Sequence, residues 1–280
     1  MRYALNVPNF GAFADVRALA ELAHEAEEAG WDGFFLWDHI GGWPAPTADP
    51  WVTLAAMAMT TTRIRLGPLV TPLPRRRPWK LARETATLDH LSNGRLILGV
   101  GIGDDTLGRE FSAYGESGDN KLHGEMLDEA LDVLTGLWSG EPFSYSGKHY
   151  TISDAQYLPR PAQQPRIPIW VAAMLPHRRP VRRAARWDGL SPIREGGRPV
   201  TPEQVRELLA IVHETRPATE PFDVVLAGYT GNLSKDAATE QLGQLAEAGV
   251  TWWQEGVLPD NTLDDLRAQI QHGPPPQVET

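Results

Sequence analysis

The chain has 280 residues, of which 41% are hydrophobic and 22% are charged, and its formal net charge is −10 at pH 7. These values are typical of a soluble globular protein, and the acidic balance argues against nucleic acid as its main partner. The absence of cysteine excludes disulfides, thiolate nucleophiles and zinc–sulfur sites. No apolar run is long enough for a membrane span and no signal peptide is recognisable, so we expect a cytoplasmic protein without membrane contact.

Strand and helix patterns alternate from the start of the chain. Asp15 can cap a helix with helical apolar spacing that ends at Gly30, because glycine adopts the left-handed conformation without strain. Residues 34–37 form a short apolar run that predicts a buried strand, and Asp38 and His39 follow it directly. Further strands are expected at 3–8, 64–70 (with a bulge at Gly67-Pro68), 95–104, 167–173, 188–191, 222–228 and 250–256. Further helices are expected at 50–61, from 78 to about 91, 122–139, after Pro180, from 202 onward, 236–249 and 262–270.

Eight strands that alternate with helices predict an α/β protein with a TIM (β/α)8 barrel, with a doubly wound sheet as the alternative. We expect one domain over residues 1–271 and a flexible, proline-rich tail over residues 272–280. Residues 140–166 contain the pattern of a small hairpin, which would be an insertion into the barrel.

In such a barrel the active site lies in the loops that follow the strands. His39 at a strand exit is therefore a candidate for acid–base work, although most histidines are structural, and Asp38 could equally cap a turn. Arg75, Arg76 and Arg77 could bind phosphate, but a solvated loop is favoured. The spacing of GVGIGD does not fit a dinucleotide site, no metal-ligand spacing accompanies Asp38 and His39, and no GxSxG elbow is present.

Several longer segments, taken together, resemble a known family. They are RRRPWKLARETATLDHLSNGRLILGVGIGD, GREFSAYGE, LDEALDVLTGLWSGEPFSYSGKHYTI, PRPAQQPRIPIWVAA and AARWDG. In this order and spacing they are similar to the luciferase-like flavin-dependent oxidoreductases, and the resemblance covers residues 3 to 271. It implies a TIM barrel that binds reduced flavin mononucleotide (FMN), or the deazaflavin coenzyme F420, at the carboxyl ends of its strands.

The resemblance also implies roles for individual residues. His39 and Asp104 would be catalytic, with Asp104 matching a carboxylate that is usually Glu in the deazaflavin branch. The remaining matched positions would bind the cofactor: Asp38 at the edge of its ring, Leu69, Val70 and Thr71 behind the ring, and Ala172, Ala173 and Met174 in the segment that cradles its phosphate in the family. Gly103, beside Asp104, is a further cofactor-binding candidate.

Two positions depart from the family pattern. Leu107 stands where the deazaflavin branch often has Asn, and Met174-Leu175 stands where many members have a Gly-Gly that holds the cofactor phosphate. We expect His177 and Arg178 to bind the phosphate instead.

The first functional prediction is a monooxygenase that uses reduced flavin on a small organic substrate. The alternative is hydride transfer with F420, and further alternatives are a non-catalytic flavin carrier and a barrel hydrolase with Asp104 and Glu255 as its carboxylate pair. The resemblance allows a flavin reductase as a partner and a homo-oligomeric assembly.

Overall fold

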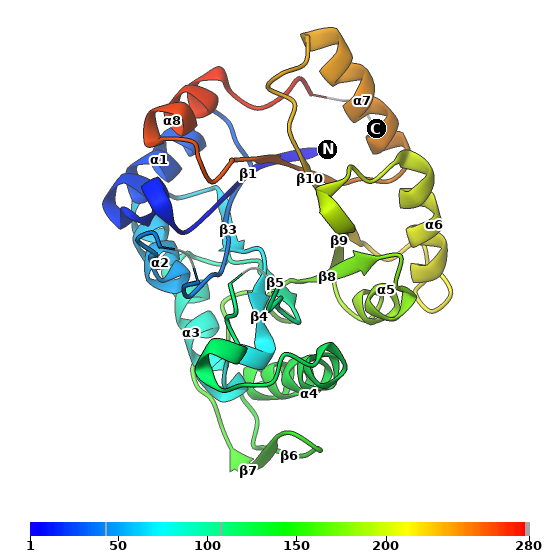
Figure 1. Cartoon of the computed structure of the whole chain (residues 1–280). Coiled ribbons are helices and arrows are strands. Elements are labelled where there is room, and N and C mark those ends of the chain that lie inside the picture. The colour runs from blue at the N-terminus through cyan, green and yellow to red at the C-terminus, as the bar shows by residue number, and fades with distance from the viewer. Residues whose placement is uncertain (43, 107, 278–280) are drawn as a thin grey trace.

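The computed structural model describes residues 1–42, 44–106 and 108–277, and for Glu195 it describes the backbone alone. Trp43 and Leu107 of the sequence analysis, and residues 278–280 of the tail, lie outside the described residues. A ring of parallel strands is surrounded by helices (Figure 1). The strands of the ring are β1 (Arg2–Val7), β2 (Gly33–Leu36), β3 (Arg65–Pro68), β4 (Thr71–Pro72), β5 (Leu98–Gly101), β8 (Ile169–Leu175), β9 (Gly189–Arg194), β10 (Asp223–Gly228) and β11 (Trp252–Gly256).

The sheet closes on itself through one stretch of chain. Its strand order is β3-β2-β1-β11-β10-β9-β8-β5-β4, and every neighbouring pair is parallel. The two edge strands, β3 and β4, are separated only by Leu69 and Val70, whose peptide bond is cis. One edge of the sheet therefore continues into the other, which confirms the predicted barrel and excludes the doubly wound sheet. The interruption lies at Leu69-Val70 rather than at the predicted Gly67-Pro68.

The predicted helix starts are confirmed at their caps. The Asp15 carboxylate accepts hydrogen bonds from the backbone N–H groups of Arg17 and Ala18, and Asp49 caps the next helix in the same way. Thr201 and Gln204 form the complete capping box that the sequence suggested. The helices are α1 (Val16–Glu28), α2 (Pro50–Thr60), α3 (Pro78–Leu91), α4 (Asn120–Trp138), α5 (Arg178–Ala184), α6 (Pro202–Val212), α7 (Lys235–Glu247) and α8 (Leu263–His272).

The core has two layers because successive side chains of a strand point to opposite faces. An outer layer joins the strands to the helices and contains Trp253, whereas the layer inside the barrel contains its neighbour Trp252. The inner layer consists of Ala4, Phe35, Leu69, Ile97, Trp170, Val225 and Trp252. Three of its rings, those of Phe35, Trp170 and Trp252, contact one another and fill the barrel.

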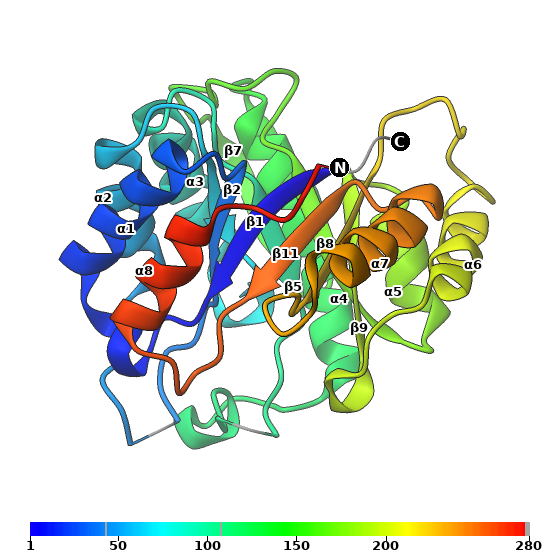
Figure 2. The same cartoon turned by 90° about the horizontal axis from the view of Figure 1, so that it is seen from above.

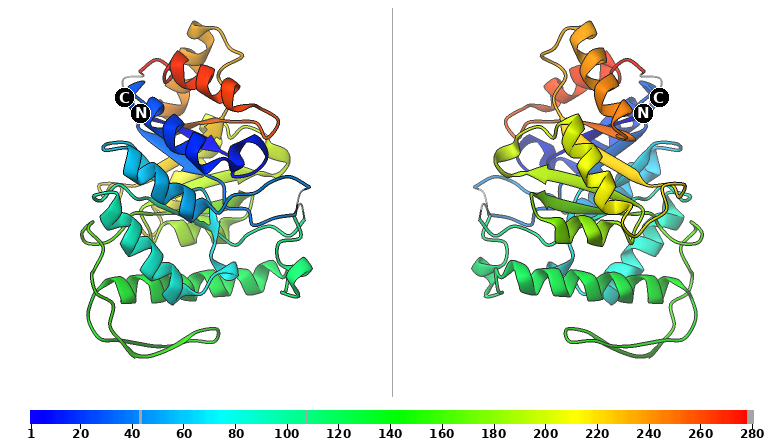
Figure 3. Two further views of the ribbon diagram at one scale, coloured as in Figure 1. Left: turned by 90° about the vertical axis from the view of Figure 1, so that its left-hand side faces the viewer. Right: turned by 90° about the vertical axis from the view of Figure 1, so that its right-hand side faces the viewer.

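The predicted hairpin is present as β6 (Phe143–Ser146) and β7 (Thr151–Ala155), an antiparallel pair separate from the barrel. It projects beyond α4 on the outside of the molecule (Figure 3). Both ends of the described chain lie at the amino ends of the barrel strands (Figure 2). The proline-rich tail contacts the barrel there, because the Tyr3 hydroxyl donates a 2.7 Å hydrogen bond to the carbonyl of Pro276. No helix in the described part of the chain has the length and apolar character that a bilayer span requires.

Candidate active site

The carboxyl ends of the strands open into what we call the barrel mouth. The segments that follow β2 and β5 lie side by side there, along the lower edge of Figure 2. A Cβ atom on Gly42 would lie 2.3 Å from the carbonyl oxygen of Gly108, so only glycine allows the two segments to approach this closely. This contact brings the predicted residues after β2 close to the long segment after β5.

Asp38 lies in a buried network of ion pairs. Arg75 Nη2 donates to Asp38 Oδ1 at 2.9 Å, and Arg76 Nη2 donates to Asp38 Oδ2 at 2.7 Å. The hydroxyl of Thr71 donates a further hydrogen bond to the same carboxylate. The solvated loop that the sequence favoured for these arginines is therefore wrong for Arg75 and Arg76: their side chains are only 6% and 17% exposed because they compensate a buried charge.

His39 is paired with a carboxylate that the sequence analysis did not identify. Its Nδ1 lies 3.3 Å from Oε2 of Glu110. The same carboxylate accepts hydrogen bonds from the backbone N–H groups of Ile40 and Gly41 at Oε1 and from Arg75 at Oε2. Burial opposes ionisation of Glu110, but the hydrogen bond with His39 and the charge of Arg75 keep its pKa below the ordinary value. Glu110 is therefore an ionised neighbour of the imidazole.

The backbone and the rings around His39 fix its orientation. The Asn9 side chain donates to the carbonyl of His39 at 2.7 Å and accepts from its N–H at 3.2 Å. The rings of Phe10 and Trp37 meet the imidazole edge to face, with centroids 5.7 and 5.8 Å away. The His39 side chain is still 28% exposed, so a ligand in the mouth can reach it.

This arrangement suits proton exchange. A carboxylate beside Nδ1 favours a proton on that nitrogen and stabilises the imidazolium, which leaves Nε2 to accept or donate a proton. Glu110 was missed because no spacing rule links residue 39 to residue 110. The signal that could have found it is the long segment between β5 and α4, since loops of that length are usually functional or disordered.

Asp104, the predicted catalytic carboxylate, bonds locally. It is exposed and accepts hydrogen bonds from the backbone N–H of Thr106 at 2.8 Å and from the Thr106 hydroxyl at 2.7 and 2.8 Å. Gly103 precedes it with φ +81°, and a Cβ there would lie 2.7 Å from the ring of Phe111. The glycines of GVGIGD thus allow this segment to pack against the loop that carries Glu110. The carboxylate that contacts His39 is therefore Glu110 and not Asp104.

The other predicted cofactor residues lie on two neighbouring parts of the mouth. Leu69, Val70 and Thr71 form the junction between β3 and β4, and a Cβ on Gly101 would lie 2.8 Å from Val70 Cγ2. Ala172, Ala173 and Met174 belong to β8, whose last residue forms a cis peptide bond with Pro176. His177 precedes α5 and Arg178 begins it, and both side chains are exposed.

The proposed hydrolase pair does not form a site. Glu255 is buried and accepts hydrogen bonds from the N–H and hydroxyl of Thr230, from Gly231 and from Trp253 Nε1. It therefore holds the segment after β10 in place, while Asp104 bonds to Thr106.

A cluster of possible metal ligands lies on the outer helix α1. It consists of His24, Glu27 and Glu28, whose ligand atoms lie within 4.8 Å of one another. The oxygens of Glu27 are already used by the backbone of residues 62–64, so this cluster is not a metal site.

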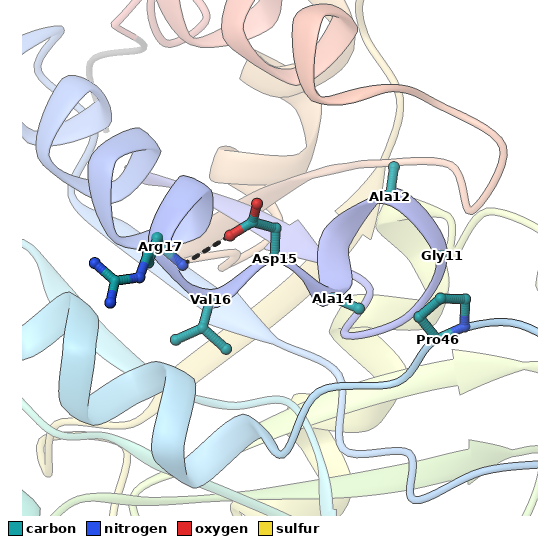
Figure 4. A pocket seen from close by; sticks show the side chains of 7 residues that line it. All are labelled: Gly11, Ala12, Ala14, Asp15, Val16, Arg17 and Pro46. Atoms are coloured by element: carbon teal, nitrogen blue, oxygen red, sulfur yellow. Dashed lines mark hydrogen bonds between the residues drawn. The ribbon is translucent and has the colours of Figure 1, made fainter.

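Two hollows are lined by residues other than His39 and Glu110. One, of about 570 Å³, is lined by residues 11–17 and Pro46 at the start of α1 (Figure 4). Its carboxylate, Asp15, accepts a hydrogen bond from the backbone N–H of Arg17 and is committed to capping the helix. The other, of about 550 Å³, lies between the end of β8 and helices α5 and α6, and the predicted phosphate ligand Arg178 lines it. Neither contains a pair of groups with a catalytic arrangement.

The sequence is similar to curated proteins over part of its length. An F420-dependent glucose-6-phosphate dehydrogenase of Microbacterium testaceum is 37% identical over 161 residues, which are 54% of this chain and 45% of that protein. The enzyme of the same name from Amycolatopsis mediterranei is 34% identical over 182 residues, or 61% of this chain and 50% of that protein. The match spans about half the length of these relatives.

Three solved structures with low sequence identity share the fold. An F420-dependent secondary alcohol dehydrogenase in complex with an F420-acetone adduct has a TM-score of 0.79 at 16% identity, covering 98% of both chains. The coenzyme F420-dependent tetrahydromethanopterin reductase from Methanopyrus kandleri has a TM-score of 0.77 at 18% identity, covering 96% of this chain and 97% of that chain. The oxygenating constituent of 3,6-diketocamphane monooxygenase from Pseudomonas putida, in complex with FMN, has a TM-score of 0.76 at 16% identity, covering 97% and 95%.

The luciferase-like monooxygenase family model matches residues 4–248, which include His39, Glu110, most of β1 and every other barrel strand except β11. The resemblance deduced from the sequence motifs is thereby confirmed. The chain belongs to the luciferase-like monooxygenase family.

Proposed function

We propose that this chain is an F420-dependent oxidoreductase that transfers a hydride between the coenzyme and a small organic substrate, with His39 exchanging the accompanying proton. The observation that carries the proposal is the His39–Glu110 pair at the mouth of a barrel whose curated relatives include F420-dependent glucose-6-phosphate dehydrogenases. The FMN-dependent neighbour is less than 25% identical and supports the fold alone. The flavin monooxygenase that we expected first is therefore the weaker candidate.

The residues present fit a flat, uncharged ring system. On the inner face near the carboxyl ends, three strands carry small side chains above the packed aromatic rings; they are Ala172, Ser191 and Ala227. Leu69, Val70 and Thr71 would lie behind the ring, and the segment of Asp38 and His39 would contact its edge. His177 and Arg178, at the end of β8, would bind the phosphate.

When bound, F420 supplies a hydride acceptor or donor and does not activate oxygen. The residues of the chain supply the rest of the chemistry. His39 Nε2 takes the proton of a substrate hydroxyl during oxidation, or returns it to a carbonyl oxygen during reduction. Glu110 stabilises the imidazolium through Nδ1, and Asn9, Phe10 and Trp37 keep the imidazole directed into the mouth. Asp104 and Gly103 would contribute by positioning the segment after β5.

An anaerobic titration with F420, and a separate one with reduced FMN, tests the choice of cofactor. We expect the protein to bind F420 more tightly, and we expect the His39→Ala variant to retain that affinity. Tighter binding of reduced FMN, followed by formation of an oxygen adduct when air is admitted, would instead identify a flavin monooxygenase.

A further inference from the structure

The inner face of the barrel carries a buried carboxamide that has no hydrogen-bond partner in the part of the chain that the structure describes. Trp253 Nε1 bonds to the carboxylate of Glu255, so these two side chains share the outer face of β11. Trp252 belongs to the cluster inside the barrel, and Gln254 must share that inner face because strand side chains alternate. Gln254 is 0% exposed, and both its Oε1 and its Nε2 lack a hydrogen-bond partner among the described residues.

A buried amide without partners is expensive, so its presence indicates a bound group that satisfies it. The Oδ1 of Asn6, on the neighbouring strand β1, is unsatisfied in the same way. The residues proposed to hold the cofactor come from the segments after β2 and β5, from β4 and from β8. Asn6 and Gln254 lie on β1 and β11, in the part of the mouth that remains for the substrate.

The charges of the inner face are confined to the opposite end of the barrel. There Arg2 forms an ion pair with Asp223 at 3.0 Å. Towards the mouth, the inward positions of the described strands carry no charged side chain. The last inward residues of β8 and β9, Met174 and Ile193, are register partners and are 45% and 43% exposed.

The segments that follow β10 and β11 continue this apolar character. Tyr229, Leu233 and Leu258 are exposed there, and the ring of Tyr229 lies against the position of Gly256. Residues 229–234 and 257–262 contain no lysine or arginine, and Asp260 is their one charged residue. In these two segments an anionic substrate such as a sugar phosphate would find an acidic group and no cation. The cations of this half of the mouth lie beyond the last inward residue of β9: they are Arg194, whose Nη1 donates to the carbonyl of Pro199, and Arg198.

We propose that the half of the mouth formed by β1, β9, β10 and β11 binds an uncharged alcohol or ketone with apolar substituents, and that Gln254 donates a hydrogen bond to its oxygen. This inference rests on the proposed function and names its substrate class. In the oxidation, the carbinol C–H bond breaks and its hydride reduces the oxidised cofactor. The O–H bond also breaks, its proton passes to His39 Nε2, and the carbon and oxygen form a carbonyl.

Binding measurements test this without relying on turnover. Quenching of tryptophan fluorescence would report the affinity for cyclohexanol, cyclohexanone and glucose 6-phosphate, with and without F420. We expect both uncharged ligands to bind more tightly than the sugar phosphate. We expect Gln254→Leu to lower the affinity for cyclohexanol and cyclohexanone about tenfold, because one hydrogen bond to a buried group is lost. The affinity for F420 should stay unchanged. Gln241→Leu, on the exposed face of α7, is the matched control.

A second variant adds a charge at an exposed position, where folding is not at risk. Ile193→Lys should weaken cyclohexanol binding and strengthen glucose 6-phosphate binding, whereas Val52→Lys on the outer helix α2 should change neither. Tighter binding of glucose 6-phosphate by the unmodified protein would overturn the proposal. An unchanged cyclohexanol affinity in Gln254→Leu would also overturn it, because the buried amide would then bind a water molecule. A reduced F420 affinity in the same variant would overturn it too, because Gln254 would then contact the cofactor.

The two proposals fail in different ways. If F420 does not bind but cyclohexanol binds and depends on Gln254, the substrate class stands and the cofactor is wrong. If F420 binds and cyclohexanol does not, the substrate class is wrong and the cofactor stands.

Discussion

The Nδ1 atom of His39 lies 3.3 Å from Oε2 of Glu110, and these residues come from two different strand exits that meet at the barrel mouth. Glu110 is in turn held by Arg75, which also pairs with Asp38. The proposed proton-exchanging group is therefore connected to a buried network in which two carboxylates are balanced by two guanidinium groups. Changes to this network should separate effects on the imidazole from effects on folding.

Removal of the imidazole should abolish most turnover without unfolding the protein. We expect His39→Ala to lower kcat by a factor of about 10² to 10⁴, the range for loss of a general acid or base. Glu110→Gln should give a smaller decrease, because the imidazole remains but loses the carboxylate that holds its Nδ1. Asp104→Asn is the matched control, and an equal or larger loss in that variant would favour Asp104 as the catalytic carboxylate. Steady-state kinetics with F420 measures kcat for all three variants.

Arg75 should be important for stability. Its guanidinium group is 6% exposed and binds both Asp38 and Glu110, so Arg75→Met leaves two buried carboxylates undercompensated. We expect a decrease in the free energy of unfolding of about 3 kcal/mol, as is usual when one partner of a buried ion pair is removed. Arg77→Met, at an exposed neighbouring position, should change it by less than about 0.5 kcal/mol. Urea unfolding followed by circular dichroism would show whether the two variants differ as expected.

A carboxylate far from the site should control acid stability. Glu27 on α1 accepts hydrogen bonds from the backbone N–H groups of Thr62, Arg63 and Ile64. Burial opposes its ionisation, but these bonds outweigh it and lower its pKa from 4.5 to about 2. The stabilisation is therefore present above pH 4.5 and is lost as the pH falls towards 2.

Glu27→Gln should consequently lower the free energy of unfolding at pH 7 by about 2 kcal/mol, the cost of losing hydrogen bonds to a charged group. The variant should also lose less stability than the natural chain between pH 4.5 and pH 2. The exposed neighbour Glu28→Gln is the control on the same helix. Parallel unfolding curves for Glu27→Gln and the natural chain across this pH range would contradict the assignment.

The sequence predicted the barrel because each strand and helix is encoded locally. The caps at Asp15, Asp49 and Thr201 and the apolar runs of the strands involve neighbouring residues, so a pattern along the chain reveals them. The partnership of His39 with Glu110 depends instead on how two loops fold against each other across Gly42 and Gly108, which no local pattern records. The sequence identified Asp104 from its place at a strand exit, whereas the structure shows that Asp104 bonds to Thr106, two residues further along the chain.

The last prediction concerns the cofactor phosphate. Many family members hold it with a Gly-Gly pair, but β8 of this chain ends in Met174-Leu175, and His177 and Arg178 follow at the start of α5. If Arg178 binds the phosphate, Arg178→Ala should weaken F420 binding about five- to tenfold, since an exposed charge-assisted contact contributes about 1 kcal/mol. The affinity of the Arg178→Ala variant for the F420 precursor that lacks the phosphate should equal that of the natural chain. The neighbouring Arg179→Ala is the control, because Arg179 lies 3.7 Å from Asp128 and is also exposed. Equal losses for the two ligands would show that Arg178 supports the fold of the mouth rather than the phosphate.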